Sequence, residues 1–194
     1  MEMAFDETRA LSDETLLVLY GNGDGTAARA LVERLGPLAY RLAVRMLGDR
    51  AEAEDLAQEA LLRLWKIAPE WRTGEAKVST WLYRVVTNLA TDRLRRRRGV
   101  GLDEAPELPD GAASALEVMI ETDRAQALEL ALAQLPARQR QAVVLRHLEG
   151  LTNPEIAVAM EIGVEAVESL TARGKRTLAQ LLAPRRAELG YGHD

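Results

Sequence analysis

The chain has 194 residues, of which 47% are hydrophobic and 28% are charged, and its formal net charge is -5. This balance is that of a globular protein and excludes wholesale disorder. Cysteine is absent and histidine occurs twice, which excludes disulfides and thiolate metal sites, so we expect no metal and no cofactor. No apolar run reaches the roughly 18 residues that span a bilayer, and the N-terminus is acidic where a signal peptide is basic. We therefore expect a cytoplasmic protein without membrane insertion.

The N-terminal half has apolar spacings of three and four residues and no strand alternation, which predicts helices. Ser12 or Asp13 is the expected N-cap of a short first helix. The glycine cluster at 21–25 follows no strand and lacks a Gly-Lys-Ser/Thr ending, so it is interpreted as a turn and not as a phosphate-binding loop. Further helices are expected at 24–35, 37–47 and 50–67, with breaks at Gly36-Pro37 and Gly48-Asp49.

A loop at 68–78 precedes a helix that Ser79 or Thr80 is expected to cap. One stripe of this helix is apolar: Trp81, Leu82, Val85, Val86, Leu89 and Leu94. The opposite stripe is polar and basic: Arg84, Thr87, Asn88, Thr91, Arg95 and Arg98. Residues 79–98 hold six arginines and one aspartate, a local charge of +5 in an acidic chain. The run is either a solvated helix end or a docking surface for a polyanion.

The composition changes at Gly99. The segment 99–114 has four glycine or proline residues before Asp110, four acids and no base, which indicates a flexible acidic linker between two lobes. The acids either screen the arginine run or keep the linker extended. Beyond it, a long helix is expected at 115–135, followed by a segment with Pro136 in a first helical turn and Gly150 as a C-cap. His147 has no second ligand nearby and is interpreted as a structural or surface residue.

The segment 151–182 has the pattern of a helix-turn-helix. Thr152 and Glu155 match a capping box at the start of a short helix. The residues expected to face inward are Ile156, Ala157 and Met160 in this helix, and Val164, Val167, Leu170 and Leu178 in the next. Residues 164–186 carry five bases and two acids, a charge of +3, which favours insertion of the second helix into the major groove of DNA over a plain structural corner.

Three segments, GDRAEAEDLAQEALLRLWK, STWLYRVVTNLATDRLRRRR and LPARQRQAVVLRHLEGLTNPEIA, occur in this order. Together the chain from about Ser12 to Leu182 resembles the extracytoplasmic-function (ECF, group IV) sigma factors of bacterial RNA polymerase, in the sigma-70 family. The resemblance implies an all-α fold with two helical lobes joined by a flexible linker. The expected parts are a region-2-like domain at 1–98, the linker at 99–114, a region-4-like helix-turn-helix domain at 115–183 and a tail at 184–194.

The resemblance also implies three interfaces. Core polymerase is expected to contact Asp55, Gln58, Glu59, Leu62 and Arg63, although an ordinary amphipathic helix with a solvated face has the same pattern. The minus-ten promoter element is expected to contact Arg72, Lys77, Arg84, Asn88, Arg95, Arg96, Arg97 and Arg98. In this set Asn88 matches a position that holds a flipped base. The minus-thirty-five element is expected to contact Glu168, Ser169, Arg173, Lys175 and Arg176.

Several residues depart from the family pattern. Glu161 and Gly163 stand in a turn that is commonly Gly-x-Ser, Glu168 replaces a common cation, and Thr171 and Gly174 replace apolar residues or alanine. Glu168 either repels DNA or accepts a hydrogen bond from a cytosine amine. Gly174 inside a helix costs up to about 1 kcal/mol relative to alanine.

The expected function is promoter recognition and DNA opening together with core RNA polymerase, under the control of an anti-sigma factor. No enzymatic activity is expected, because no acid–base pair, metal cluster or nucleotide loop is found. Two alternatives remain open: a sigma-like decoy that sequesters a regulator, and a helix-turn-helix regulator that never contacts core polymerase.

Overall fold

The computed structural model describes residues 8, 10–72, 74, 77–99 and 116–185, and this part of the chain consists of helices, turns and loops without a strand. The first lobe contains α2 (Asp13–Gly21), α3 (Gly25–Leu47), α4 (Arg50–Ile67), a 3-10 turn (Ala68–Glu70) and α5 (Val78–Gly99). The second contains α6 (Leu116–Ala133), α7 (Ala137–Val143), a π-helical turn (Val144–Leu148), α8 (Asn153–Met160), α9 (Val164–Leu182) and a 3-10 turn (Ala183–Arg185). Gly99 belongs to α5, whereas the rest of the predicted linker and most of the predicted tail lie outside the described residues.

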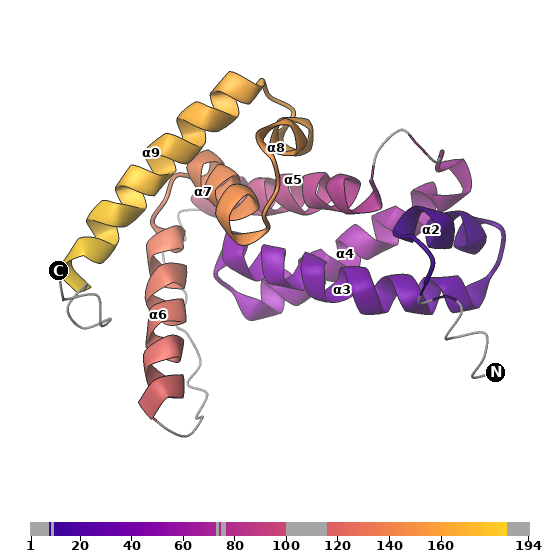
Figure 1. Cartoon of the computed structure of the whole chain (residues 1–194), viewed down its shortest axis with the longest axis horizontal. Coiled ribbons are helices and arrows are strands. Elements are labelled where there is room, and N and C mark those ends of the chain that lie inside the picture. Colours follow the sequence, from indigo (N-terminus) through magenta and orange to yellow (C-terminus); the bar gives the residue numbers. More distant parts are fainter. Residues whose placement is uncertain (1–7, 9, 73, 75–76, 100–115, 186–194) are drawn as a thin grey trace.

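The first lobe is a helical bundle in which α3, α4 and α5 pack against one another and α2 lies across one end (Figure 1). Its core is mainly leucine and alanine at helical spacing, including the fully buried Leu31, Leu42, Leu56, Leu64 and Leu82. Ser12, Asp24 and Asp49 accept hydrogen bonds from first-turn amides of α2, α3 and α4, which confirms the predicted cap at Ser12 and the predicted turn at 21–25.

The predicted break at Gly36-Pro37 is wrong, because α3 runs continuously from Gly25 to Leu47 with Pro37 inside it. An interior proline removes one backbone hydrogen bond and costs about 3 kcal/mol. Both halves of the helix nevertheless bury apolar side chains in one core, with Leu35 before the proline and Ala39 after it. Gly36 has no Cβ, so the usual clash of proline with the preceding side chain is absent.

The predicted caps of α5 are also wrong. The helix begins at Val78, so Ser79 and Thr80 lie in its first turn. The amide of Val78 donates to the Glu14 Oε1 atom of α2 over 3.1 Å. A carboxylate from another helix thus satisfies an amide at this N-terminus, and no local sequence pattern identifies it.

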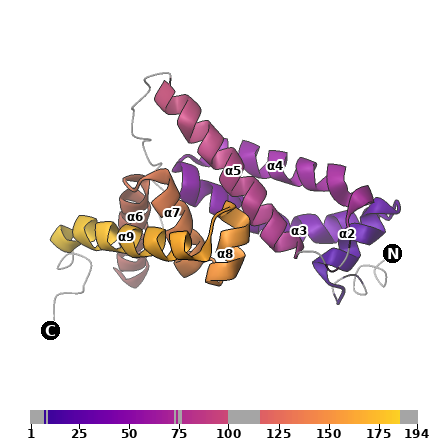
Figure 2. The ribbon, with the colours of Figure 1, turned by 90° about the horizontal axis from the view of Figure 1, so that it is seen from above.

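In the second lobe α7 crosses α9, α6 contacts α9, and α8 precedes α9 in the helix-turn-helix (Figure 2). The capping box of Thr152 and Glu155 is confirmed, and Gly150 has the predicted left-handed backbone with φ 74°. Pro136 occupies the N-cap of α7, just before its first turn. Ile156, Met160 and Val167 are buried as predicted. Val164 is 40% exposed, so its predicted inward orientation is wrong: it is the first residue of α9, where the chain turns toward solvent.

The two lobes pack against each other. Helix α8 packs across α5, and α7 contacts both α3 and α5; the two perpendicular views agree on this arrangement (Figures 1 and 2). The buried core therefore continues from the first lobe into residues such as Leu145 and Ile156 of the second.

Candidate polymerase and nucleic-acid interfaces

Helix α4 turns its predicted polymerase-binding face to solvent. Asp55, Gln58, Leu62 and Arg63 are exposed, and Leu62 is 58% exposed although it is apolar. The Glu59 carboxylate is half-buried and accepts hydrogen bonds from Arg63 over 2.7 Å and from Arg93 over 3.3 Å. Leu62 is thus an exposed apolar side chain among polar neighbours on this face.

The arginine run at the end of α5 divides into two sets. Arg93 and Arg97 turn toward α4: Arg93 donates to the Glu52 carbonyl over 2.7 Å, and Arg97 approaches the carboxylates of Asp49 and Glu52 at 3.4 and 2.6 Å. Arg97, predicted to contact DNA, is therefore engaged within the protein, as is Arg93, which was not among the predicted site residues. These two arginines tie the end of α5 to the start of α4.

The second set in the run is solvent-facing. Arg96 is exposed, and Arg95 is exposed while pairing with Asp92 of its own helix at 3.1 Å. The helix includes Arg98, whose side chain lies outside the described residues. The positive potential of the run is thus partly neutralised by carboxylates, and Arg96 is its clearest candidate for a phosphate contact.

Asn88 is exposed between two buried neighbours, Thr87 and Leu89. Its amide is therefore available to a ligand while its position on α5 is held by packing on both sides. Thr87 was predicted on the open stripe, but it is only 1% exposed because the second lobe covers it. Trp81 packs edge-on against Trp71, with ring centroids 6.4 Å apart, which supports a packing role for Trp81.

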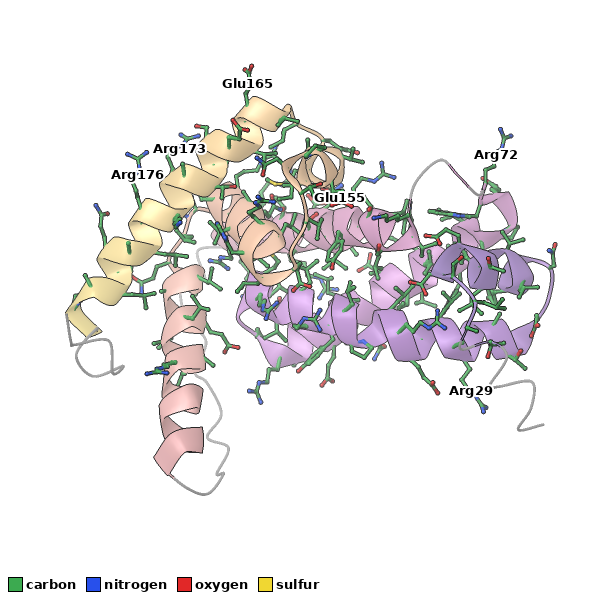
Figure 3. All side chains as sticks on the ribbon, in the orientation of Figure 1. Arg29, Arg72, Glu155, Glu165, Arg173 and Arg176 are labelled. Atoms are coloured by element: carbon green, nitrogen blue, oxygen red, sulfur yellow. The ribbon has the colours of Figure 1, made fainter. Side chains whose placement is uncertain are left out.

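The remaining predicted minus-ten residues lie near the start of α5. Arg72 projects into solvent from the loop before α5 (Figure 3). The other two pair with the second lobe: the Lys77 Nζ atom is 3.1 Å from Glu155, and Arg84 is 3.7 Å from Glu161. Hydrogen bonds from the Thr152 amide and hydroxyl, followed by that from Lys77, lower the pKa of Glu155 to about 2. Glu155 therefore remains ionised at neutral pH.

The outer surface of α9 is acidic at its N-terminal end, where Glu165 and Glu168 are exposed, and basic further along the helix (Figure 3). Ser169, Arg173, Lys175 and Arg176 are exposed, and Arg173 and Arg176 project away from α6 and α7 (Figure 3). The opposite side of α9 holds the buried Gly174, where an added Cβ would lie 2.6 Å from the Val143 Cγ2 atom. The departure from the family pattern at Gly174 thus has a structural explanation: α7 and α9 cross too closely for a side chain.

The two departures of acidic character also have defined positions. Glu168 is exposed and accepts a hydrogen bond from the Asn153 amide over 3.3 Å, so its carboxylate is oriented at the N-terminal half of α9. Glu161 ends α8 with φ 54°, a left-handed backbone that normally selects glycine. Among the described residues it is the one non-glycine residue with positive φ.

The most buried carboxylate among the ion pairs between the lobes was not anticipated from the sequence. Glu149 follows the π-helical turn, and its side chain is 1% exposed. Its carboxylate accepts from Arg41 over 2.9 Å and from Arg45, and the Tyr83 hydroxyl lies 3.4 Å away. Burial, followed by the negative charge of Glu149, raises the pKa of Tyr83 to about 12, so the phenol stays protonated and can donate.

A second interlobe contact is made by Gln141 of α7. Its buried amide donates to the Thr87 carbonyl over 3.1 Å and to the Thr91 hydroxyl of α5.

In the described ranges no group of three His, Cys, Asp or Glu side chains could hold a metal ion. Among the helices that the structure describes, none is both long and apolar enough to cross a membrane.

Comparison with known proteins identifies the family of both lobes. The model of sigma-70 region 2 matches residues 31–100, and the model of sigma-70 region 4 matches residues 125–178. The two matches contain, respectively, the α4–α5 surfaces and the helix-turn-helix described above.

Curated relatives match over most of the chain. The ECF RNA polymerase sigma factor SigM of Mycobacterium tuberculosis is 32% identical over 174 residues, covering 88% of this chain and 85% of the relative. SigW of Bacillus subtilis is 29% identical, covering 82% and 91%. SigE of Mycolicibacterium smegmatis is 32% identical over 81% of this chain, which spans 62% of that longer protein. The chain belongs to the ECF sigma factors of the sigma-70 family.

Solved structures agree with the fold. The sigma factor RpoE from Bartonella quintana, determined in complex with the anti-sigma factor NepR, superposes with a TM-score of 0.65 at 22% identity, covering 80% of this chain and 96% of that chain. CnrH, determined in complex with the cytosolic domain of CnrY, also gives a TM-score of 0.65, at 23% identity with coverages of 89% and 97%. These likenesses support the all-helical fold.

Proposed function

We propose that the protein binds core RNA polymerase, directs it to promoters with minus-thirty-five and minus-ten elements, and stabilises the opened minus-ten strand. The observation that carries the proposal is the basic outer surface of α9, where Arg173 and Arg176 face away from the protein core. A basic second helix in a helix-turn-helix suits the major groove. The protein itself performs no covalent chemistry in this proposal, and it acts in the cytoplasm.

The three interfaces have separate tasks. Leu62 and its polar neighbours on α4 bind core polymerase. Helix α9 reads duplex DNA through Ser169, Arg173, Lys175 and Arg176, with Glu168 favouring a cytosine amine. Asn88 holds an unstacked base of the minus-ten strand, while Arg72, Lys77, Arg84, Arg95 and Arg96 are the phosphate contacts. Arg97 has a mainly structural role because α4 carboxylates engage it.

The division into a region-2-like part at 1–98, a linker at 99–114, a region-4-like part at 115–183 and a tail at 184–194 is retained in this proposal. Because a linker joins the lobes, binding of one lobe raises the effective concentration of the other lobe near its own binding site. An anti-sigma protein is the proposed regulator, supported by the structure of RpoE, a sigma factor of the same fold that was determined with the anti-sigma factor NepR.

The test is reconstituted transcription with bacterial core polymerase and a pool of genomic promoter fragments. Transcript starts that require the protein and share two spaced sequence elements support the proposal. Core binding without promoter-specific starts instead indicates a decoy that sequesters a regulator. Absence of core binding leaves a helix-turn-helix regulator that acts without core polymerase.

A further inference from the structure

The ion pairs between the lobes have one polarity. Throughout the described residues, each ion pair that joins the lobes takes its carboxylate from the second lobe and its cation from the first. The carboxylates belong to Glu149, Glu155 and Glu161, and the cations to Arg41, Arg45, Lys77 and Arg84. A nucleic-acid backbone would present the same negative charge to the first lobe.

Two of these cations belong to the proposed minus-ten surface. Glu155 occupies Lys77 and Glu161 lies beside Arg84, while Gln141 covers Thr87 and Thr91 further along α5. Asn88 remains exposed between these contacts. The second lobe therefore covers part of the helix on which an opened strand would lie, and both cannot occupy this surface together.

Glu149 fixes this arrangement through side chains that belong to neither proposed DNA surface. Its buried carboxylate is shared by Arg41 and Arg45 of α3 and lies beside Tyr83 of α5. Neutralising Glu149 leaves Arg41, 48% exposed, and Arg45, 23% exposed, without their carboxylate partner, which disfavours the packed state. Glu149 and Arg41 can be changed without altering any proposed DNA contact.

We propose that the second lobe is an autoinhibitory cover: Glu149 holds it closed, and Glu155 and Glu161 occupy first-lobe cations in place of nucleic-acid phosphate. Nucleic-acid binding and lobe closure then compete. The apparent affinity for nucleic acid therefore equals the intrinsic affinity multiplied by the fraction of molecules whose lobes are open. The inference rests on the proposed function only for the identity of the covered surface.

The distance between the lobes is measured on the full chain by spin labels. Since the chain has no cysteine, Arg29→Cys on α3 and Ala179→Cys on α9 provide two unique labelling positions, both solvent-exposed. The unmodified interface is expected to give one narrow distribution of interlobe distances. Glu149→Gln should add a second, broader distribution, whereas Glu33→Gln, an exposed change of equal charge on α3, should not.

Binding to a fluorescent pool of random-sequence single-stranded oligonucleotides is measured on the same variants. Glu149→Gln should tighten binding about fivefold or more, as expected of an interdomain coupling, relative to Glu33→Gln. If circular dichroism shows that Glu149→Gln does not fold, both measurements are made on Arg41→Gln instead. Arg41 lies on the exposed edge of the cluster, and its substitution leaves the pair of Arg45 with Glu149 in place.

Opening together with tighter binding supports the inference. Opening without tighter binding shows that the lobe does not cover a nucleic-acid surface, and unchanged distances show that Glu149 does not hold it closed; either result overturns the inference. The transcription test of the proposed function is independent, since it can fail while distance and affinity still change together.

Discussion

Gly174 of α9 lies so close to Val143 of α7 that a Cβ atom at Gly174 would be 2.6 Å from the Val143 Cγ2 atom and 3.2 Å from the Gln139 carbonyl oxygen. We therefore predict that Gly174→Ala destabilises the protein, although alanine is the better helix former by about 1 kcal/mol. Overpacking of this kind costs about 1–3 kcal/mol, which should exceed the gain. Chemical denaturation measures the free energy of unfolding.

The matched control is a double-mutant cycle with Val143→Ala. That change removes the Cγ2 contact but leaves the Gln139 carbonyl, so Gly174→Ala should cost less in its presence without becoming neutral. A stabilising Gly174→Ala in the original background would show that the two helices separate easily.

The arginine run should divide into a stabilising and a DNA-binding residue. Arg97→Ala removes partly exposed ion pairs with Asp49 and Glu52 and should lower the free energy of unfolding by up to about 1 kcal/mol. Arg96→Ala should leave stability unchanged and weaken promoter binding by the polymerase complex, with the slope of affinity against salt reduced by about one ion. Equal effects of the two changes on both measurements would contradict this division.

The capping box should give the second lobe a defined acid sensitivity. The pKa of Glu155 is lowered to about 2 in the folded protein, below its ordinary value of 4.5. The stabilisation is thus present above pH 4.5 and is lost as the pH falls through the folded pKa of about 2. Glutamine keeps the capping hydrogen bonds but cannot titrate.

Glu155→Gln should therefore flatten the dependence of unfolding free energy on pH in this window. Denaturant titrations at several pH values measure it, and Glu165→Gln is the control because Glu165 is exposed on α9. If the unfolding free energy depended on pH equally in both variants, the hydrogen bonds of Glu155 with Thr152 and Lys77 would not stabilise its ionised form.

Leu62 should be a binding residue for core polymerase. Because it is 58% exposed, Leu62→Ala should leave the unfolding free energy nearly unchanged and weaken core binding by about tenfold or more, as at other interface hot spots. Leu130→Ala is the matched control, since Leu130 is 42% exposed on α6, away from this surface. Binding is measured by fluorescence anisotropy of labelled protein; equal affinities of the two variants would remove Leu62 from the interface.

The individual helices were largely predictable because their signals are local. Apolar spacing gave α4, α6 and α9, and cap residues such as Ser12 and Thr152 predicted their helix starts correctly. The errors arose where residues distant in the sequence determine where a helix begins or ends. Glu14 caps α5 from another helix, and packing on both sides of Pro37 keeps α3 continuous.

The family motifs predicted which helix surfaces matter, but not how the lobes meet. Glu149 and Arg41 are 108 positions apart in the chain, and neither belongs to a motif that signals such a contact. The buried Thr87 has the polar character of an exposed stripe, and it is covered by α7, whose Gln141 is 54 positions further along the chain. Pairings between distant charges have no periodicity from which they could be inferred.

We propose that Asn88 holds an unstacked base while polymerase opens the promoter. The most direct test places a fluorescent base analogue in the minus-ten element of a promoter found by transcript mapping. With core polymerase and the unmodified protein, we predict a fluorescence rise that core polymerase alone does not produce. Asn88→Ala should diminish that rise about tenfold or more while core binding persists. Full opening with Asn88→Ala, or opening by core polymerase alone, would contradict the account.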